Sequence, residues 1–375
     1  MLTLPVLAGE FQIFGDNAPA LNLAICWKHF LNILVESQSA GNLIDLNHLG
    51  ILREYTPEIV CCNSLLLKHP PRPSRPVREG REGGSDTSSF NVPSSNNNYK
   101  FISYLTGLIE GDGTIIVPKT ERSSKGKLNY PSIQIVFHLK DIPLALLIQK
   151  NLGGSLIRKK GVNAYILYIN DQKEILNLVR LLNGNMKTPK INSLYKLIDW
   201  LNNKNTNLNL TKLPLNTNSL KNDAWLSGMI ESDGHFSVRT TMNGKYPKIE
   251  CKFELSQRQT DHLGYSNEIF LANIAKFLNT SLKNIRENTP HPQYRLRTVS
   301  LETNLILVNY LNEYPLFGSK FLDFNDWKEI LNLFITRFKY SQENVDKVLN
   351  LKSEMNDRRT IFTWNHLNKF YNLDY

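Results

Sequence analysis

The stretch Tyr104–Gly113, YLTGLIEGDG, is the most informative part of the sequence, because it returns once as Trp225–Gly234, WLSGMIESDG. Each copy is an apolar run with small residues four apart, and it ends in an acid followed by a glycine. The two acids, Asp112 and Asp233, are 121 residues apart (233 − 112). A motif that occurs twice in one chain predicts two similar halves related by a pseudo-twofold axis.

Each copy predicts the last turns of a helix. Residues four apart lie on one face of a helix, so Gly107 and Gly111 would let another backbone come close. Gly228 and Ser232 hold the same positions in the second copy. We therefore expect the two helices to pack on each other along these small faces.

Helices packed in this way would bring the two acids together. Asp112 and Asp233 would lie at a shared C-terminal end, where two carboxylates repel each other and face the negative ends of two helix dipoles. This arrangement favours a bound cation, and oxygen ligands in a mostly hydrated site suit Mg²⁺. The glycines that follow the acids, Gly113 and Gly234, predict a left-handed residue at each helix end.

The paired motifs resemble those of the LAGLIDADG homing endonucleases, in the form that carries both repeats in one chain. One acid–glycine helix end alone is commonly just a cap, but two copies, each followed by a similar pattern, favour the family. The resemblance covers about residues 100–340. It implies an α+β fold in which two pseudo-symmetric αββαββα repeats form an antiparallel-sheet DNA saddle around two central motif helices. It also implies a monomer, because both repeats are in one chain.

The charge distribution points to the same half of the chain. The net charge is +10, and residues 100–375 hold 37 Lys and Arg against 25 Asp and Glu, whereas residues 1–99 hold 7 against 9. A basic surface favours nucleic acid through counterion release, although an ordinary solvated surface is the alternative. No apolar run is long enough to span a membrane, so no membrane partner is expected. The four cysteines show no metal-ligand spacing.

The stretch Leu2–Gly9, LTLPVLAG, resembles part of cytochrome c oxidase subunit I. This resemblance suits a reading frame that continues from an exon of that gene into a group I intron, and it implies an organelle-encoded, mitochondrial protein. A small accessory domain is the alternative for the first segment. The expected domains are an upstream exon and intron segment (1–67), a disordered linker (68–100), the first repeat (101–201), an inter-repeat linker (202–222), the second repeat (223–340) and a C-terminal helical tail (341–375).

Hydrophobic periodicity predicts the same element order in both repeats. The first repeat is expected to have strands at 114–119, 132–139, 155–158 and 165–169, and helices at 142–152, 173–182 and 191–201. The second is expected to have strands at 235–240, 249–257, 282–286 and 294–300, and helices at 267–278, 301–311 and 321–338. We expect the tail to pack on the second half.

The resemblance also implies the roles of the site residues. Asp112 and Asp233 would hold Mg²⁺, which Mn²⁺ can replace, with the backbone carbonyls of Gly111 and Ser232 as further ligands. The glutamates two residues before the acids, Glu110 and Glu231, would support the structure.

Three further residues match catalytic positions of the family. Lys190 and Lys320 match the late lysine of each repeat, near the cleaved phosphate, where a solvated surface lysine is the alternative. Gln257 matches a glutamine at the end of the second strand of a repeat. The first repeat departs from this pattern, and His138 is expected either to substitute or to mark an unequal site.

Polar residues on the sheet strands and on the turns between them are the expected DNA contacts. Strands in the major groove would use the polar sheet faces, although such faces are usually just solvated. The candidates are Lys119, Arg122, Lys125, Lys127, Gln134, His138, Arg158, Lys160, Arg239, Lys245, Lys252, Arg258, Arg286, Arg295 and Arg297.

The sequence thus predicts a site-specific double-strand DNA endonuclease with a long asymmetric target. The alternative is an RNA maturase that binds its own intron RNA and assists its splicing, with or without cleavage. Retention of both acids favours cleavage, because a protein that only binds RNA does not need them.

Overall fold

The chain is described from a computed structural model, which covers residues 96–242, 248–336 and 340–371. The expected segment 1–67, most of the expected linker and Lys245 lie outside these described residues. All of the elements below belong to one compact unit of the chain, 76–375.

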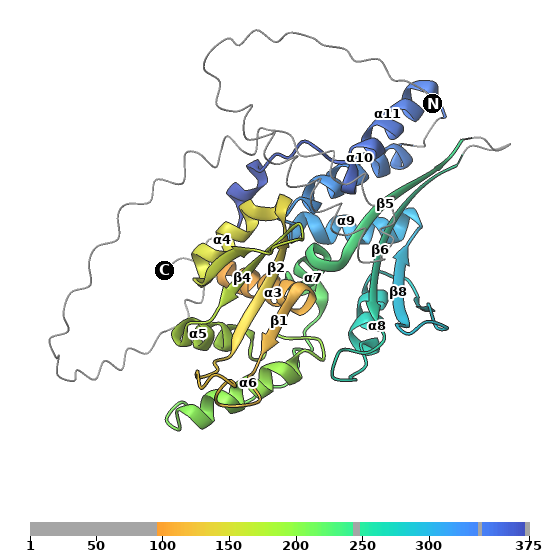
Figure 1. The fold of residues 1–375 in the computed structure, drawn as a ribbon. Helices are drawn as coiled ribbons and strands as arrows, with labels where there is room; N and C mark the ends of the chain where they lie inside the picture. Colours follow the sequence, from red (N-terminus) through yellow and green to blue (C-terminus); the bar gives the residue numbers. More distant parts are fainter. Residues whose placement is uncertain (1–95, 243–247, 337–339, 372–375) are drawn as a thin grey trace, which may run out of the picture. The chain divides into compact units, whose positions relative to one another are not determined.

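The first repeat begins earlier than expected, because its motif helix starts at Asn96, inside the stretch assigned to the linker. Figure 1 shows this helix beside the sheet that follows it. The elements in order are α3 (Asn96–Asp112), β1 (Gly113–Ile116), β2 (Ser132–His138), a short 3₁₀ turn η2 (Leu139–Asp141), α4 (Ile142–Leu152), β3 (Ser155–Arg158), β4 (Ala164–Ile169), α5 (Gln172–Leu182) and α6 (Ile191–Lys204).

The second repeat has the same order, so the predicted two-repeat α+β fold is confirmed. A 3₁₀ turn, η3 (Leu220–Asn222), precedes it. The elements are α7 (Trp225–Asp233), β5 (Gly234–Thr241), β6 (Lys248–Arg258), α8 (Glu268–Phe277), β7 (Leu282–Ile285), β8 (Gln293–Thr298), α9 (Leu301–Glu313) and α10 (Lys320–Ile335). The tail adds α11 (Gln342–Ser353) and the 3₁₀ turns η4 (Asn356–Arg358) and η5 (Asn365–Lys369).

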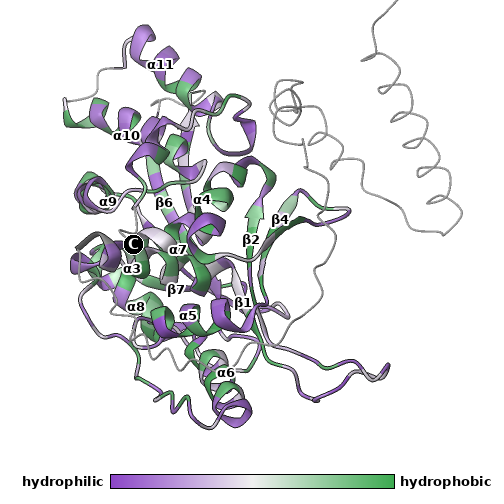
Figure 2. Cartoon of the chain, turned by 90° about the vertical axis from the view of Figure 1, so that its left-hand side faces the viewer, coloured by the Kyte–Doolittle hydropathy of each residue, from purple (hydrophilic) through white to green (hydrophobic). Residues whose placement is uncertain are grey.

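Each repeat builds one four-stranded antiparallel sheet, in the order β1-β2-β4-β3 or β5-β6-β8-β7. In the central strands β2 and β6, buried apolar residues alternate with more exposed ones. This alternation follows from the two-residue period of a strand and leaves each sheet with one buried and one open face. Figure 2 shows β2 and β4 as largely hydrophobic elements.

The two motif helices are in backbone contact at their glycines. A side-chain carbon added at Gly107 would lie 2.0 Å from the Trp225 carbonyl oxygen, and one added at Gly228 would lie 1.9 Å from the Tyr104 carbonyl oxygen. Tyr104 and Trp225 are equivalent residues of the two motifs, so the contact is symmetric. A side chain larger than hydrogen at either glycine would force the helices apart.

The expectation of left-handed glycines at the helix ends is wrong. Gly234 has φ −73° and ψ 148°, which is extended backbone, and Gly113 is not among the described residues with positive φ. Both glycines instead start a strand close against the last helical turn. A side-chain carbon at Gly113 would lie 2.5 Å from the Ile109 carbonyl oxygen, and one at Gly234 would lie 2.7 Å from the Ile230 side chain.

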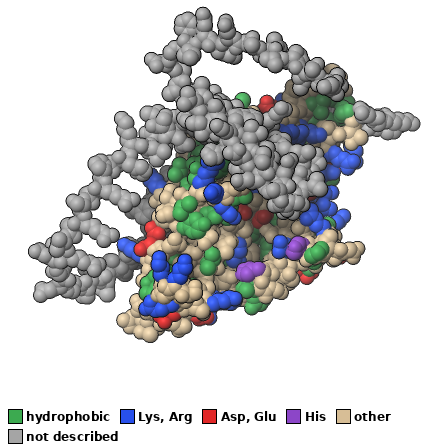
Figure 3. Space-filling view, in the orientation of Figure 1, with side chains coloured by type: hydrophobic (Ala, Val, Ile, Leu, Met, Phe, Trp, Pro, Cys, Tyr) green, Lys and Arg blue, Asp and Glu red, His purple; other side chains and the backbone are tan. Residues whose placement is uncertain are grey.

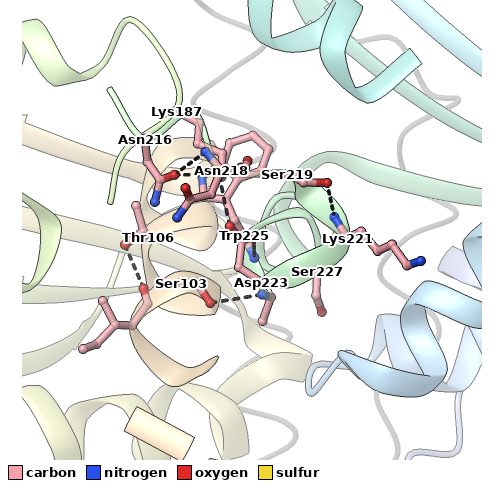
Figure 4. A network of polar contacts seen from close by, with 12 residues as sticks. Ser103, Thr106, Lys187, Asn216, Asn218, Ser219, Lys221, Asp223, Trp225 and Ser227 are labelled. Atoms are coloured by element: carbon pink, nitrogen blue, oxygen red, sulfur yellow. Dashed lines mark hydrogen bonds and ion pairs between the residues drawn. The ribbon is translucent and has the colours of Figure 1, made fainter. Parts of the chain in front are cut away.

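A buried ion pair joins the two repeats beside the inter-repeat linker. Lys187 Nζ lies 3.0 Å from Asp223 Oδ2 and donates hydrogen bonds to the Asn216 side chain and the Asn218 carbonyl. Figure 4 shows Lys187 reaching these linker residues beside the start of α7. Polar contacts therefore help to hold the linker, and Leu208 and Leu210 of the linker also pack against the hydrophobic core.

The tail contacts more than the second half, so the expectation for it is incomplete. The ring of Phe370 lies 5.7 Å from that of Phe101 on α3 and 4.9 Å from that of Phe317, between centroids. Arg359 pairs with Asp323 and Asp326 on α10. In the described part of the chain, no helix is long and apolar enough to cross a membrane.

Candidate active site

The two acids of the motifs lie where the motif helices end and the sheets begin. Asp112 is the last residue of α3, and Asp233 is the last residue of α7. A side-chain carbon at Gly111 would lie 3.0 Å from Asp233 Oδ2, so this carboxylate leans over the end of the other helix. Asp112 keeps an exposed side, which leaves the pair open to solvent.

The proximity of the acids changes their titration. Partial loss of water and the negative charge of Asp233 raise the pKa of Asp112 to about 7, although Lys320 and Lys190 oppose the rise. Desolvation also raises the pKa of Asp233, against the same two lysines. Two carboxylates that resist ionising together form a site at which a cation is stabilised.

Both lysines lie beneath the acids and donate to the carbonyl groups that end the motif helices. Lys190 Nζ donates to the carbonyl oxygens of Ile109 (2.9 Å), Gly111 (3.3 Å) and Gly113 (2.6 Å). The positive charge of the lysine therefore offsets the negative end of the helix dipole, where the last carbonyls of the helix lack helical partners. Burial lowers the pKa of Lys190.

Lys320 makes the equivalent contacts in the other repeat. Its Nζ donates to the carbonyl oxygens of Ile230 (3.0 Å) and Ser232 (3.1 Å), and burial lowers its pKa. We expected both lysines beside the cleaved phosphate. The structure holds both ammonium groups at the helix ends, under the acids, and this role beside the phosphate stays a prediction. Lys320 is the first residue of α10, and Lys190 directly precedes α6.

The two glutamates of the motifs anchor the loops that carry these lysines. Glu110 accepts hydrogen bonds from the backbone N–H groups of Lys187 and Thr188, and from the Trp225 indole at 2.5 Å. Glu231 accepts from the Phe317 backbone N–H at 2.7 Å. Burial raises the pKa of both glutamates, and these donors oppose the rise.

These bonds also cross between the repeats. Trp225, which starts the second motif helix, donates to Glu110 of the first. Tyr104 of the first motif donates in the same way to Glu231 of the second, at 3.2 Å. The binding of the glutamates by Tyr104 and Trp225 was not predicted from the sequence. Both residues occupy the first position of their motif and both carry a hydrogen-bond donor, and this shared feature could have indicated the role.

Gln257 holds only one of the two acids. Its amide Nε2 donates to Asp233 Oδ2 at 2.5 Å. The sheet registers pair Ile135 with Gly113 and Leu255 with Gly234, so the position equivalent to Gln257 is Phe137. Phe137 is apolar and buried.

His138 does not substitute for the missing glutamine, because it lies one residue further on and shares the register position of Arg258. Its ring nitrogen instead accepts from the Lys140 backbone N–H at 3.2 Å. The two acids are therefore in chemically different settings.

Two open hollows flank the acid pair, and each combines both repeats. One, of about 290 Å³, is lined by Asp112, His138 and Asp141 of the first repeat and by Lys320 of the second. Asp141 accepts a hydrogen bond from the Ser319 backbone N–H at 2.6 Å, which joins η2 to the start of α10.

The other hollow, of about 240 Å³, is lined by Gly111 and Lys190 of the first repeat and by Gln257 and Asp261 of the second. Asp261 holds the register position of Asp141. It caps its own loop instead, by accepting from the Leu263 and Tyr265 backbone N–H groups.

The donor atoms at the acids fit a hard cation. They are the carboxylates of Asp112 and Asp233 and the carbonyls of Gly111 and Ser232, which are oxygen atoms throughout. Each carbonyl accepts one lysine bond, and a carbonyl has a second lone pair. Among the described residues, no group of three or more His, Cys, Asp or Glu could hold a metal ion by itself. A Mg²⁺ ion that keeps several of its waters needs only one or two carboxylates.

The described DNA-contact candidates are all exposed or half-buried. Two of them are paired with acids: Lys252 Nζ lies 2.7 Å from Glu250 Oε2, and Arg297 Nε lies 2.5 Å from Glu254 Oε1. Arg158 shares the helix-facing side of its strand with Leu156, because it pairs with Tyr165 next to the buried Phe137. Figure 3 shows Lys and Arg along the edge of the molecule where β5 and β6 lie.

The sequence also matches a family model, for the LAGLIDADG endonucleases, over residues 105–201 and 226–331. The protein "Intron-encoded DNA endonuclease aI3" of Saccharomyces cerevisiae is 31% identical over 302 residues, which are 72% of each chain. The chain therefore belongs to the LAGLIDADG endonuclease family.

Two further similarities bear on function and fold. "Intron-encoded RNA maturase bI4" of Saccharomyces cerevisiae is 27% identical over 179 residues, which are 47% of this chain and 25% of that protein. The crystal structure of the I-LtrWI LAGLIDADG homing endonuclease bound to target DNA matches with a TM-score of 0.55. It is 20% identical and covers 70% of this chain and 100% of that one, which shows the shared fold.

Proposed function

We propose that this protein is a site-specific DNA endonuclease that makes a double-strand cut in a long asymmetric target by hydrolysing phosphodiester bonds. The single observation that supports this most strongly is the acid pair. Asp112 and Asp233 end two helices in backbone contact, so one central cation site can serve both strands of a duplex.

The cation we propose is Mg²⁺, with Mn²⁺ as a substitute. When bound, it would polarise the scissile phosphate and make water a better nucleophile. Asp112, Asp233 and the carbonyls of Gly111 and Ser232 would hold it, and the Gln257 amide would keep the Asp233 carboxylate in place.

The lysines have a separate task in this proposal. Lys190 and Lys320 carry positive charge within the polar site, and they would stabilise the charge that builds on phosphate oxygens during the reaction. Their bonds to helix-end carbonyls hold them in position for this before DNA arrives. The first repeat has Phe137 at the position equivalent to Gln257, and this difference supports unequal cleavage rates on the two DNA strands.

We further propose that the protein acts as a monomer and is encoded in a group I intron of a mitochondrial oxidase gene. The exon-like stretch at residues 2–9 and the intron-encoded relative support this origin. The natural target would then be the intronless copy of the same gene, across the codons of that stretch.

A cleavage assay tests the proposal. Purified protein and Mg²⁺ are mixed with a plasmid that carries the intronless oxidase gene, with Asp112→Asn and Asp233→Asn proteins as matched controls. We expect a linear product from the wild type and none from either control. If the plasmid stays intact, and plasmids that carry overlapping fragments of the gene stay intact as well, the endonuclease proposal is refuted for this target.

The maturase relative favours one second candidate, assistance in splicing of the protein's own intron RNA. This activity does not need the acid pair. Tight binding of the intron transcript, equal in wild type and Asp112→Asn protein, would support it. Binding no tighter than to an unrelated transcript would exclude it.

A further inference from the structure

The open faces of the two sheets carry different chemistry at equivalent positions. The registers can be aligned, because Ile135 lies opposite Gly113 in the first sheet and Leu255 lies opposite Gly234 in the second. Each strand position of one sheet therefore has a partner in the other, and the two faces can be compared residue by residue.

The first sheet has a line of three apolar side chains across its open face. Ile157 on β3 pairs with Ile166 on β4, which pairs with Val136 on β2. Ile157 is 52% exposed and Val136 is 39% exposed, while Ile166 lies buried between them. We call these three residues the apolar row.

The second sheet has no such row. The equivalent positions hold Lys283, Arg295 and Ser256, which are cross-strand neighbours in the same way. Over the described strands, the open face of the first sheet carries no Lys, Arg, Asp or Glu. Further replacements bring charge to the second sheet. First sheet to second, they are Ser132 to Lys252, Gln134 to Glu254, His138 to Arg258 and Tyr168 to Arg297.

Basic loops lie at the two opposite ends of the strands that carry the apolar row. Lys119, Lys125 and Lys127 are exposed in the connection between β1 and β2, and Lys159 and Lys160 are exposed in the turn between β3 and β4. Lysines at the ends of strands suit phosphates, which position a protein on DNA without reading sequence. The strand centres between them would then face the base edges.

An exposed apolar side chain has one specific partner at a base edge, the C5-methyl group of thymine in the major groove. Arginine and lysine instead suit guanine O6 and N7, and a carboxylate suits the amino group of cytosine. The second face offers these groups in place, since Arg297 and Glu254 are held by their ion pair.

We propose that the apolar row reads thymine methyl groups in one half of the target, while the charged face of the second sheet reads guanine and cytosine in the other half. This inference rests on the proposed function. It makes the target asymmetric in base type, with thymines facing the exposed Ile157 and Val136 and with G·C pairs facing Arg295 and Arg297.

A binding selection with the full chain tests this inference without cleavage. Wild-type protein is incubated with a randomised duplex library in Ca²⁺ in place of Mg²⁺, and the retained duplexes are sequenced. The swapped variants Ile157→Lys and Lys283→Ile are selected in parallel. Both positions are exposed on strands, so each variant can fold, and each marks the half that its own sheet contacts.

The best duplex is then rebuilt with deoxyuridine for thymidine in one half at a time, which removes only the methyl groups. We expect affinity to fall about fourfold for each contacted methyl group in the half marked by Ile157→Lys. The same replacement in the other half should change affinity less than twofold.

Four outcomes would overturn the inference. Equal losses in the two halves would show that methyl readout is not specific to the half that faces the apolar row. Unchanged base preferences for Ile157→Lys would remove the row from the interface. An unselected library would refute DNA recognition itself, whereas selection of a sequence that is then insensitive to deoxyuridine leaves the proposed function intact and rejects only this inference.

Discussion

Replacing Gly107 with alanine should separate the two motif helices. The new carbon would lie 2.0 Å from the Trp225 carbonyl oxygen and 3.0 Å from the Met229 backbone nitrogen. Ordinary contact begins near 3.4 Å, so the helices must move apart by more than about 1 Å. Backbone atoms form this contact, and they cannot rotate away as a side chain can.

Two effects of this separation can be given a size. Overpacking a close interface destabilises a protein by about 3 kcal/mol at the upper end of the usual range. For a folded region of this size, that lowers the midpoint of thermal unfolding by roughly 6–12 °C. The acids move with their helices, and a misplacement of about 1 Å at a catalytic group can slow a reaction by about 100-fold.

Thermal unfolding and plasmid cleavage would be measured on Gly107→Ala, on Gly228→Ala and on Gly161→Ala as the control. Gly161 has φ +79° and open space around it, so its alanine variant loses only about 1 kcal/mol and keeps full activity. Gly228→Ala should match Gly107→Ala, since it meets the Tyr104 carbonyl oxygen at 1.9 Å. A stable and active Gly107→Ala protein would refute the close helix contact.

Four more outcomes follow from particular contacts. Glu110→Ala leaves buried donors without an acceptor and should lower the free energy of unfolding in urea by about 3–5 kcal/mol; an unchanged midpoint would contradict the network. Gln257→Leu releases Asp233 and should slow cleavage of one strand about 10-fold or more, so that nicked plasmid accumulates; equal slowing of both strands would argue against unequal sites. Burial raises the pKa of the Cys251 thiol to about 12, so at pH 8 it stays protonated, and mass spectrometry should find it unmodified by a thiol reagent until urea is added. Phe370→Ala should lower the free energy of unfolding by about 3 kcal/mol, and an unchanged free energy would show that the tail does not pack on the core.

The two lysines bind the same carbonyl groups that are expected to hold the cation. Lys190 and Lys320 donate to the Gly111 and Ser232 carbonyls, which are the ligands expected beside the acids. A cation and an ammonium group would therefore share each carbonyl. The lysines lower the cost of placing two carboxylates together, and the proposed cation would complete that neutralisation.

Local patterns in the sequence determined most of the fold. The two-residue period of 132–139 and 249–257 predicted strands whose apolar residues are buried, and the observed β2 and β6 agree. The expected helix 142–152 matches α4. Burial on one face is a local demand, so it is written into neighbouring residues and can be read from them.

The repeated motif likewise predicted the paired helices and their acids, because small residues and carboxylates at fixed places specify a close contact. What it could not give was the register between distant strands. The register makes Phe137, and not His138, the structural equivalent of Gln257, and it makes Ile157 the equivalent of Lys283. A shift of one residue turns a side chain to the other face, and only hydrogen bonds between strands fix the choice.

The roles of the lysines and of the motif glycines were also decided by tertiary structure. The Lys190 ammonium group binds carbonyls that are distant in sequence, those of Ile109, Gly111 and Gly113. Gly113 and Gly234 are needed for close approach to a helix and not for a left-handed turn. Sequence determined which residues carry the charge and the small volume, and packing across the pseudo-twofold determined what they touch, because those contacts join residues that the chain keeps far apart.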